Sequence, residues 1–266
     1  MTAFADRKEK RSGRLALILL GVFAIACLIA LILVGDLARY QDAGMIGESQ
    51  AALRDVSDPE QLDQALKRYP ANRILKLVTL ANEKAAEIDA ATRKMLNEAE
   101  PASLSKLVYL TASSRSDLEA LSRDLKTAEG NVTNAKSRID ALVKSNRDQL
   151  QNSARSLGVE SNTIARYMTA VDEQNAEMAA LATRMLTARA EYYGAYEKCA
   201  ALLVREFGSY KVTNGQFIFR LQPTADSYNA ASAAMAATTK RAAELEGEKA
   251  GLKQSQLGRW KKFVEP

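Results

Sequence analysis

The chain has 266 residues, of which 47% are hydrophobic and 6% aromatic, with 37 Lys+Arg against 32 Asp+Glu and no histidine. Histidine is the side chain best suited to proton transfer near neutral pH, so its absence removes most catalytic triads as well as His-ligated zinc and haem sites. Two cysteines, Cys27 and Cys199, are too few for a disulfide framework or a four-thiolate zinc site. The composition therefore predicts a non-enzymatic protein without metal or cofactor, stabilised by packing.

The first element expected along the chain is a membrane anchor at residues 15–35, after a basic tail at residues 1–14. The run from Leu15 to Val34 carries no charge, and as a helix it would span the hydrocarbon core of about 30 Å. Basic residues precede it and acidic residues dominate after it, which predicts a cytoplasmic N-terminus and a periplasmic or extracellular bulk of the chain. We expect a single-pass protein of the inner (plasma) membrane. The residues that carry this prediction are Leu15, Leu20, Phe23, Leu28 and Val34 in the anchor, and Arg7, Lys8, Lys10, Arg11 and Arg14 before it.

Two other interpretations of this region stay open. A cleaved signal peptide also has a basic start, but its apolar core is only about 7 to 15 residues long. The residues Ala24-Ile25-Ala26-Cys27 resemble a bacterial lipoprotein signal, in which the cysteine is lipidated. The residues after Cys27 are apolar, whereas a mature lipoprotein usually becomes polar there. Cys27 is therefore a candidate lipidation site beside the favoured uncut anchor.

The high net charge reflects topology more than ligand binding. Five of the 37 basic and two of the 32 acidic residues precede Val34, so the net charge beyond it falls from +5 to +2. A nucleic-acid binder needs a concentrated basic face with stacking aromatic side chains, which this region lacks. We therefore expect no nucleic-acid partner.

Beyond the anchor, a juxtamembrane segment at residues 36–70 should contain one short helix. Ser57-Asp58-Pro59-Glu60 is typical of a helix start, and Tyr69-Pro70 should stop that helix. The remainder, residues 71–266, should form a helical bundle whose first long helix runs from about Ala71 to Glu98, ended by Pro101.

The most regular pattern in the chain is a heptad seam. It predicts one helix from about Ser103 to Ser156, about 80 Å long, that continues through Gly130-Asn131. Leu157-Gly158 should cap it, and the same period then resumes to about Leu202, so the two helices should lie antiparallel. The turn between them, around Gln149 to Ile164, could extend past shorter neighbours and be exposed. The seam positions are Leu118, Leu121, Leu125, Ala128, Val132, Ala135, Ile139 and Leu142.

A β-hairpin is expected at about residues 210–220, before a final helix that opens at Pro223-Thr224. Asn214-Gly215 between two β-prone runs is the strongest short hairpin signal. Phe217, Ile218 and Phe219 are consecutive apolar residues that cannot all be hidden by an isolated ribbon. Either the ribbon packs on one end of the bundle, or it offers an edge to another protein. These three residues are the first candidates for an interaction site.

The second candidates are Trp260 and Phe263 in Arg259-Trp260-Lys261-Lys262-Phe263. Cations mixed with aromatics at a helix end are typical of membrane-interface segments. The alternative is that both aromatic residues cap the core of the bundle while the cations stay in water. The tyrosines at 192, 193 and 196 near Cys199 are best interpreted as core packing.

The stretch from Val204 to Met235, with Lys211-Val-Thr-Asn-Gly215, Phe217-Ile-Phe219, Pro223-Thr224 and Tyr228-Asn229, resembles the end of an uncharacterised family of bacterial helical envelope lipoproteins. The resemblance covers about thirty residues. It implies a bacterial envelope location and adds weight to Cys27 as a lipidated residue.

These observations predict an all-α protein: one transmembrane helix, then an exported long antiparallel coiled-coil bundle with a small hairpin. The favoured function is a membrane-anchored envelope protein whose bundle scaffolds or binds another envelope protein, or a second copy of itself. A sensory ligand-binding bundle that signals through a partner is the first alternative. An export-system adaptor with a long helical hairpin is the second.

Overall fold

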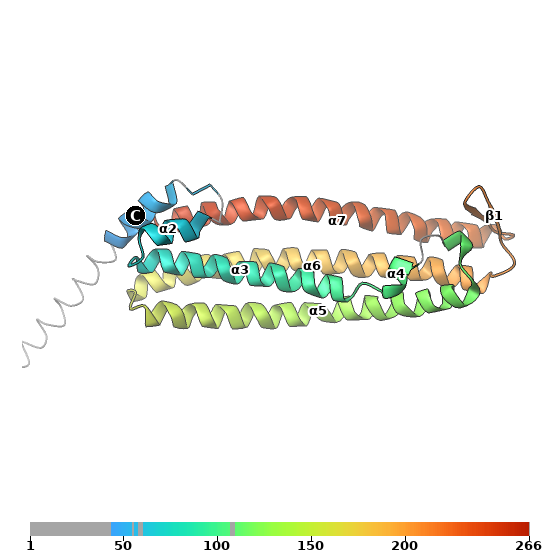
Figure 1. The fold of residues 1–266 in the computed structure, drawn as a ribbon, viewed down its shortest axis with the longest axis horizontal. Coiled ribbons are helices and arrows are strands. Elements are labelled where there is room, and N and C mark those ends of the chain that lie inside the picture. The colour runs from blue at the N-terminus through green and yellow to red at the C-terminus, as the bar shows by residue number, and fades with distance from the viewer. Residues whose placement is uncertain (1–43, 55, 58–60, 107–109, 266) are drawn as a thin grey trace, which may run out of the picture.

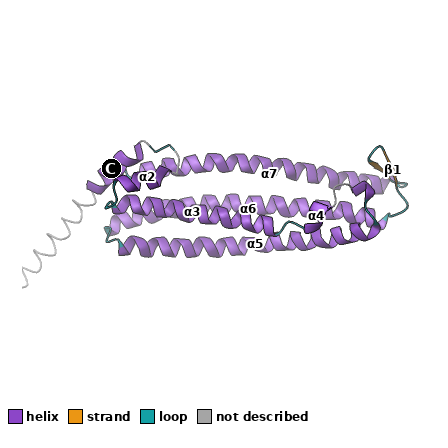
Figure 2. Cartoon of the chain, in the orientation of Figure 1, coloured by secondary structure: helices purple, strands orange, loops and turns teal. Residues whose placement is uncertain are grey.

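The structure, a computed structural model, describes residues 44–54, 56–57, 61–106 and 110–265 (Figure 1). Residues 44–54 are helical, and nearly all of the described chain that follows is helical too (Figure 2). The elements in chain order are α2 (Leu62–Arg68), α3 (Arg73–Glu98), α4 (Ala102–Lys106), the 3-10 turn η2 (Leu110–Ala112), α5 (Arg115–Ser156), α6 (Ser161–Arg205), β1 (Lys211–Thr213), β2 (Gln216–Ile218) and α7 (Gln222–Phe263).

Three long helices define an elongated bundle. Helices α5 and α6 run antiparallel along their lengths, α7 returns along α6, and α3 packs on α5 and α6 over part of the bundle (Figure 1). The 42 residues of α5 make a rod of about 63 Å. We call the end that holds residues 44–54, the α5–α6 turn and the C-terminus the base, and the opposite end the hairpin end. The predicted helical bundle with one small hairpin is confirmed.

Helix α5 begins twelve residues later than the heptad pattern predicts. The expected single helix from Ser103 is wrong, because the chain forms α4 and η2 before α5 starts at Arg115. Ser114 caps α5: the Asp117 N–H donates to Ser114 Oγ at 3.2 Å, and the Ser114 N–H donates to the Asp117 carboxylate at 3.1 Å. This reciprocal pair satisfies two backbone donors that a helix start leaves free, so it fixes the start there.

The heptad seam itself is confirmed. Leu118, Leu121 and Leu125 are fully buried, and helix α5 continues through Gly130-Asn131 without a turn. At its end Leu157 is the C-cap and Gly158 adopts a φ of +66°, a conformation that glycine enters at little cost. Arg73 of α3 donates hydrogen bonds to the Leu157 and Gly158 carbonyls at 3.2 and 2.8 Å. The turn is thus tied to the neighbouring helix.

The α5–α6 turn does not overhang the bundle. Leu150, Ala154 and Val159 have at most 7% of their surface exposed and belong to a large core at the base. That core also takes in side chains of residues 44–54, α2, α3 and the last turns of α7. The expected overhang is therefore wrong, because segments distant in sequence pack beside the turn, while Gly158, Ser161 and Asn162 at its surface are exposed.

Helix α3 begins at Arg73 because Asn72 caps it. The Leu75 N–H donates to Asn72 Oδ1 at 2.9 Å, which places Asn72 at the N-cap. The same buried amide donates to the Met45 carbonyl at 2.8 Å and accepts from Ser49 Oγ at 3.1 Å. One side chain therefore starts α3 and fastens the helical segment 44–54 to the base.

A layer of buried amides separates the base core from the core nearer the hairpin end. Asn146 of α5, Gln174 and Asn175 of α6 and Gln256 of α7 are each at least nine-tenths buried. In each helix they lie between the side chains of the two hydrophobic clusters. Asn146 Nδ2 donates to the Lys84 carbonyl of α3 at 3.2 Å. Buried polar side chains of this kind favour one helix register over its alternatives.

Candidate functional site

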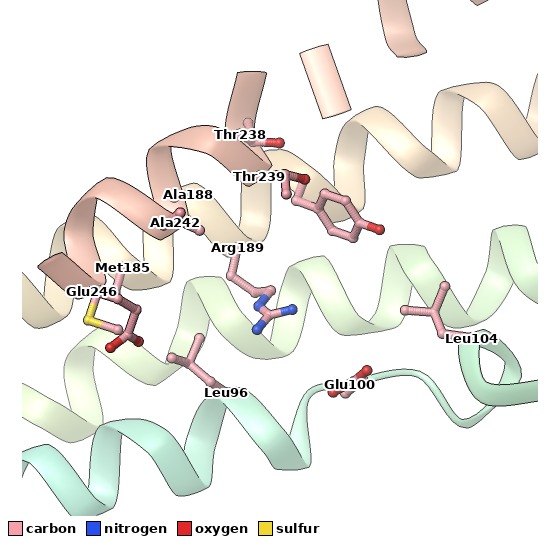
Figure 3. A pocket seen from close by; sticks show the side chains of 12 residues that line it. Leu96, Glu100, Leu104, Met185, Ala188, Arg189, Thr238, Thr239, Ala242 and Glu246 are labelled. Atoms are coloured by element: carbon pink, nitrogen blue, oxygen red, sulfur yellow. The ribbon is translucent and has the colours of Figure 1, made fainter. Parts of the chain in front are cut away.

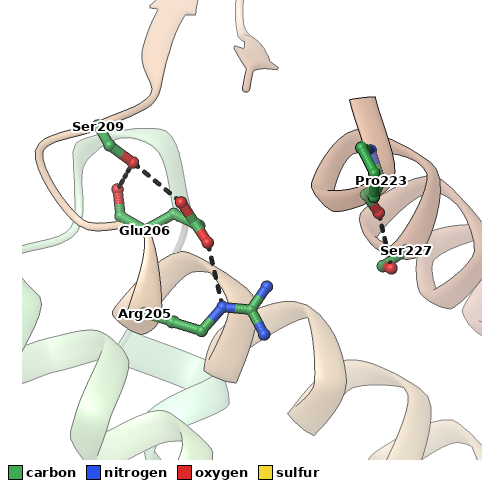
Figure 4. Close-up of polar contacts among 5 residues, drawn as sticks. All are labelled: Arg205, Glu206, Ser209, Pro223 and Ser227. Atoms are coloured by element: carbon green, nitrogen blue, oxygen red, sulfur yellow. Dashed lines mark hydrogen bonds and ion pairs between the residues drawn. The ribbon is translucent and has the colours of Figure 1, made fainter. Parts of the chain in front are cut away.

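The hairpin end is built from the last turn of α6. Glu206 ends the helix, and Ser209 Oγ donates to the Glu206 carbonyl at 2.7 Å and to its carboxylate at 3.1 Å (Figure 4). Arg205 pairs with the same carboxylate at 3.1 Å. Gly208 has a φ of +83°, which turns the chain sharply away from the helix axis. Phe207 and Tyr210 are carried on this turn.

The hairpin that follows has the predicted turn. Asn214 and Gly215 have φ values of +51° and +75°, as the favoured two-residue hairpin turn requires. Strands β1 and β2 pair Val212 with Phe217 and Lys211 with Ile218. Directly opposed residues share a face of the ribbon, so Phe217 and Ile218 project to opposite sides.

One face of the hairpin packs on α7 through aromatic rings. We define the hairpin aromatic cluster as Tyr210, Phe217, Phe219 and Tyr228. Its ring centroids lie 5.2 Å apart for Tyr210–Phe217, 5.4 Å for Phe217–Tyr228 and 5.3 Å for Phe219–Tyr228. These separations are typical of favourable aromatic pairs. Because Tyr228 is in α7, the cluster holds the ribbon against the bundle. Ser227 Oγ donates to the Pro223 carbonyl at 2.8 Å in the same first turns of α7 (Figure 4).

The other side chains of this end are exposed. Phe207 and Val212 are 42% exposed, Ile218 is 51% exposed and Leu221 is 62% exposed, and no other large hydrophobic side chain of the described residues is comparably exposed. We call these four residues the tip patch. All four belong to the hairpin end, but Val212 is on the ribbon face of Phe217 and Ile218 is on the opposite face, so they surround the tip rather than form one flat surface. Exposed apolar side chains gathered at one end of a molecule are typical of interaction sites, whereas scattered ones are not.

The charges around the tip patch are mainly positive. Lys211 and Arg220 are exposed in the hairpin and the segment after it, and Arg205 is also exposed but paired with Glu206. Burial raises the pKa of Tyr210, and it raises the pKa of Tyr228 to about 12, so both phenols stay neutral at physiological pH. The tip patch is therefore an apolar surface with positive charges at its edge.

Trp260 and Phe263 lie at the base, inside the core. Trp260 is 1% exposed and Phe263 is 9% exposed, and both rings contact Tyr167 of α6 at centroid distances of 5.8 and 6.0 Å. The Tyr167 hydroxyl donates to the Leu77 carbonyl of α3 at 3.0 Å. The neighbouring Arg259 pairs with Glu173 and Glu177 of α6. The structure therefore places the two aromatic side chains in the packing position rather than on the surface.

The tyrosines near Cys199 also serve packing. Tyr193, Tyr196 and Cys199 are buried, whereas Tyr192, which the pattern places on the seam, is half-buried. Burial raises the pKa of Cys199 to about 11, which disfavours the reactive thiolate. Within the described residues, no three acidic, cysteine or histidine side chains come together as a metal site would require.

The residues of the predicted anchor, its basic flank and Cys27 lie outside the described residues. Among the described helices, none combines the length and apolar character needed to cross a bilayer.

Sequence reasoning found the hairpin and its three central apolar residues, but it did not single out the other residues of this end, which are Phe207, Tyr210, Val212, Leu221 and Tyr228. A signal was present, since six large apolar or aromatic residues beside the three named ones fall between positions 204 and 228. The structure brings them together because the end of α6 and the start of α7 are adjacent.

No protein-family model, curated protein or solved structure matches the chain. The resemblance to bacterial envelope lipoproteins stays a prediction.

Proposed function

We propose that this is a non-enzymatic, membrane-anchored envelope protein that binds another protein with its hairpin end. The observation that carries the proposal is the tip patch, because the exposed large hydrophobic side chains of the described residues fall within fifteen positions of the chain. Protein-binding surfaces usually consist of an apolar patch surrounded by polar residues.

The packing beneath the patch supports binding without a large loss of entropy. The hairpin aromatic cluster fixes the ribbon on α7 before any partner arrives, and the Asn214-Gly215 turn sets its register. Pre-organised surfaces lose less conformational freedom on association than flexible ones do. Lys211 and Arg220 favour a partner whose own rim is acidic, because complementary charge speeds encounter and rejects basic competitors.

The position of the patch gives the bundle its role. The first described residues lie at the base and the hairpin lies at the opposite end (Figure 1). If residues 15–35 anchor the chain, the bundle holds the tip patch about 60 Å from the base, as the length of α5 requires. The protein then acts as a rigid spacer that presents a binding surface away from its membrane.

In-cell photocrosslinking of the full-length protein in native membranes tests the proposal. A photoreactive residue replaces exposed Gln216 in the hairpin, and a matched one replaces exposed Lys253 of α7 near the base. We expect one protein to be captured from position 216 and not from position 253, and to bind the purified full chain directly.

The double variant Ile218→Ser/Leu221→Ser should abolish the position-216 adduct and weaken direct binding at least tenfold. Thr213→Ala, an exposed substitution on the same hairpin, is the matched control and should change neither. Adducts that persist in the double variant, or that join two copies of this chain alone, would contradict binding of another protein at this end.

A further inference from the structure

The strand register divides the side chains of the hairpin between two faces. Directly opposed residues of an antiparallel pair share a face, and neighbours along a strand alternate. Val212 and Phe217 are opposed, and Phe217 contacts Tyr228 of α7 at a ring-centroid distance of 5.4 Å, so we call theirs the inner face. The opposite, outer face carries four exposed side chains, which are Lys211, Thr213, Gln216 and Ile218.

The bundle covers only part of the inner face. Phe217 of β2 is half-buried against Tyr228, whereas Val212, opposite it on β1, is 42% exposed. Ile218 on the outer face is 51% exposed. The hairpin therefore has one exposed large apolar side chain on each of its two faces.

A flat partner surface covers only one face of a ribbon, because side chains on the two faces project in opposite directions. Such a surface would leave either Val212 or Ile218 in water. Facing layers of backbone pack about 10 Å apart, so a cleft that covers both faces needs walls whose backbones stand about 20 Å apart. Each apolar side chain that is removed from water adds to the binding free energy, so a cleft is favoured over a flat surface.

The two faces also differ in charge. Lys211 lies directly opposite Ile218 on the outer face and has no acidic partner within the described residues. The acidic residues nearest to it along the chain are engaged, because Glu206 pairs with Arg205 and Asp226 accepts a hydrogen bond within the first turns of α7. The exposed part of the inner face, in contrast, is apolar at Val212. A complementary cleft therefore has one acidic wall and one apolar wall.

We propose that the partner is a protein with a cleft that receives the hairpin between two walls. The wall on the outer face has an apolar pocket for Ile218 and a carboxylate that pairs with Lys211. The wall on the inner face is apolar and covers Val212. This inference rests on the proposed binding of another protein at the tip patch, and it adds the shape and the charge of the partner's site.

In-cell photocrosslinking of the full-length protein in native membranes tests this geometry. Photoreactive residues replace Gln216 on the outer face and Val212 on the inner face, and exposed Lys253 of α7 is the control site. We expect positions 216 and 212 to capture the same protein through two separate segments of it, and position 253 to capture none.

The outcomes separate the cleft from protein binding itself. Capture from one hairpin position alone, or of different proteins from the two positions, would overturn the cleft and leave binding of a protein at this end standing. Adducts with lipid alone, adducts with a second copy of the chain alone, or no adduct from either position would overturn both.

Binding of the captured protein, once purified, to full-length variants gives a second measure. Val212→Ser and Ile218→Ser should each weaken binding at least about fivefold. Lys211→Glu should weaken it at least about tenfold, whereas Lys211→Arg should stay within about twofold of the parent. Circular dichroism and the rate of trypsin cleavage after Arg220 should match the parent in all four variants. Parental binding by Val212→Ser or by Lys211→Glu would refute the two-walled cleft.

Discussion

The two ends of the bundle each carry an aromatic cluster, yet only one of them is closed. At the base, Tyr167, Trp260 and Phe263 are at least nine-tenths buried, and the Tyr167 hydroxyl reaches the backbone of α3. At the hairpin end, Phe217 is only half-buried, and Ile218 beside it is half-exposed. Similar side chains therefore have different surroundings.

The difference comes from how many elements meet at each end. Helices α2 and α3 and residues 44–54 close over the base, whereas α3 ends at Glu98 and never reaches the hairpin. The aromatic rings of the hairpin pack on one another, on Phe207 in the turn after α6 and on Tyr228 of α7. Whether an aromatic residue at a helix end is buried depends on segments distant in sequence. The cations next to it in the sequence do not predict its burial.

The largest effect is expected at the base. Trp260→Ala should destabilise the full chain by about 3 to 5 kcal/mol, because it empties a fully buried site that several segments share. Urea unfolding followed by circular dichroism measures the change. Lys253→Ala, an exposed substitution in the same helix, should stay within about 0.5 kcal/mol of the parent. A loss below about 1 kcal/mol for Trp260→Ala would mean that the base is not closed.

Alkaline pH should lower the stability of the part of the bundle around Cys199 and Tyr228 before it lowers the stability of the base. Cys199 Sγ contacts the Tyr228 carbonyl at 4.0 Å, and burial raises the pKa of Cys199 to about 11. The fold favours the protonated thiol, so its contribution is complete below the pKa of the unfolded thiol, about 8.5 to 9, and is lost as the pH rises through about 11. A shift of about two pKa units corresponds to a loss of about 3 kcal/mol.

Melting temperatures of the parent and of Cys199→Ala between pH 8 and 11.5 measure this effect. The parent should lose stability more steeply than the variant in that window. Tyr167, whose pKa burial raises, should affect both proteins alike. Burial and then the charge of Cys199 raise the pKa of Tyr228 to about 12, so Tyr228 ionises later in the parent. Parallel profiles would show that the thiol is not held in a dry environment.

Phe219→Ala should have a smaller effect, confined to the hairpin end. The side chain is half-buried against Tyr228, so we expect a loss of about 1 to 2 kcal/mol with the helicity retained. Limited trypsin digestion should then cleave faster after Lys211 and Arg220, as mass spectrometry can show. Val212→Ala on the same ribbon is the control and should cleave at the parent rate. General unfolding of Phe219→Ala would place the hairpin in the core of the bundle.

Ile218→Ser should barely change stability, because the side chain is about half exposed. We expect a change within about 0.5 kcal/mol in the same urea experiment. The variant therefore separates binding at the tip patch from folding. A loss above about 1.5 kcal/mol would show that Ile218 supports the ribbon and would remove it from the exposed surface.

The sequence predicts what depends on neighbours within a few turns. The heptad seam from Leu118 to Ile139 and the Asn214-Gly215 turn are confirmed because their periods and dihedral preferences are local. The start of α5 was missed because the seam outweighed the cap, although Ser114 and Asp117 have the spacing of a capping box.

The rest depends on distant contacts. The burial of Trp260 comes from Tyr167 and from the segment that includes Leu53, which lie far from it in sequence. Tyr192 and Tyr193 differ by one position, about 100° around the helix, and only the placement of α3 and α7 decides which of them is buried. The cavity lined by Leu96, Arg189 and Ala242 (Figure 3) exists because α3 ends before α6 and α7 do. No residue of α6 indicates where α3 ends.

The base core unites Leu53 with Trp260, about 200 residues apart along the chain. During synthesis, α5 and α6 can pair as soon as both have emerged, since they are consecutive and joined by a short turn. The base must wait for the last turns of α7, and until then Tyr167 and Leu53 are exposed to water. Assembly of the protein should therefore proceed from the middle of the chain outward, with closure of the base as the slow final step at which chaperones or proteases can intervene.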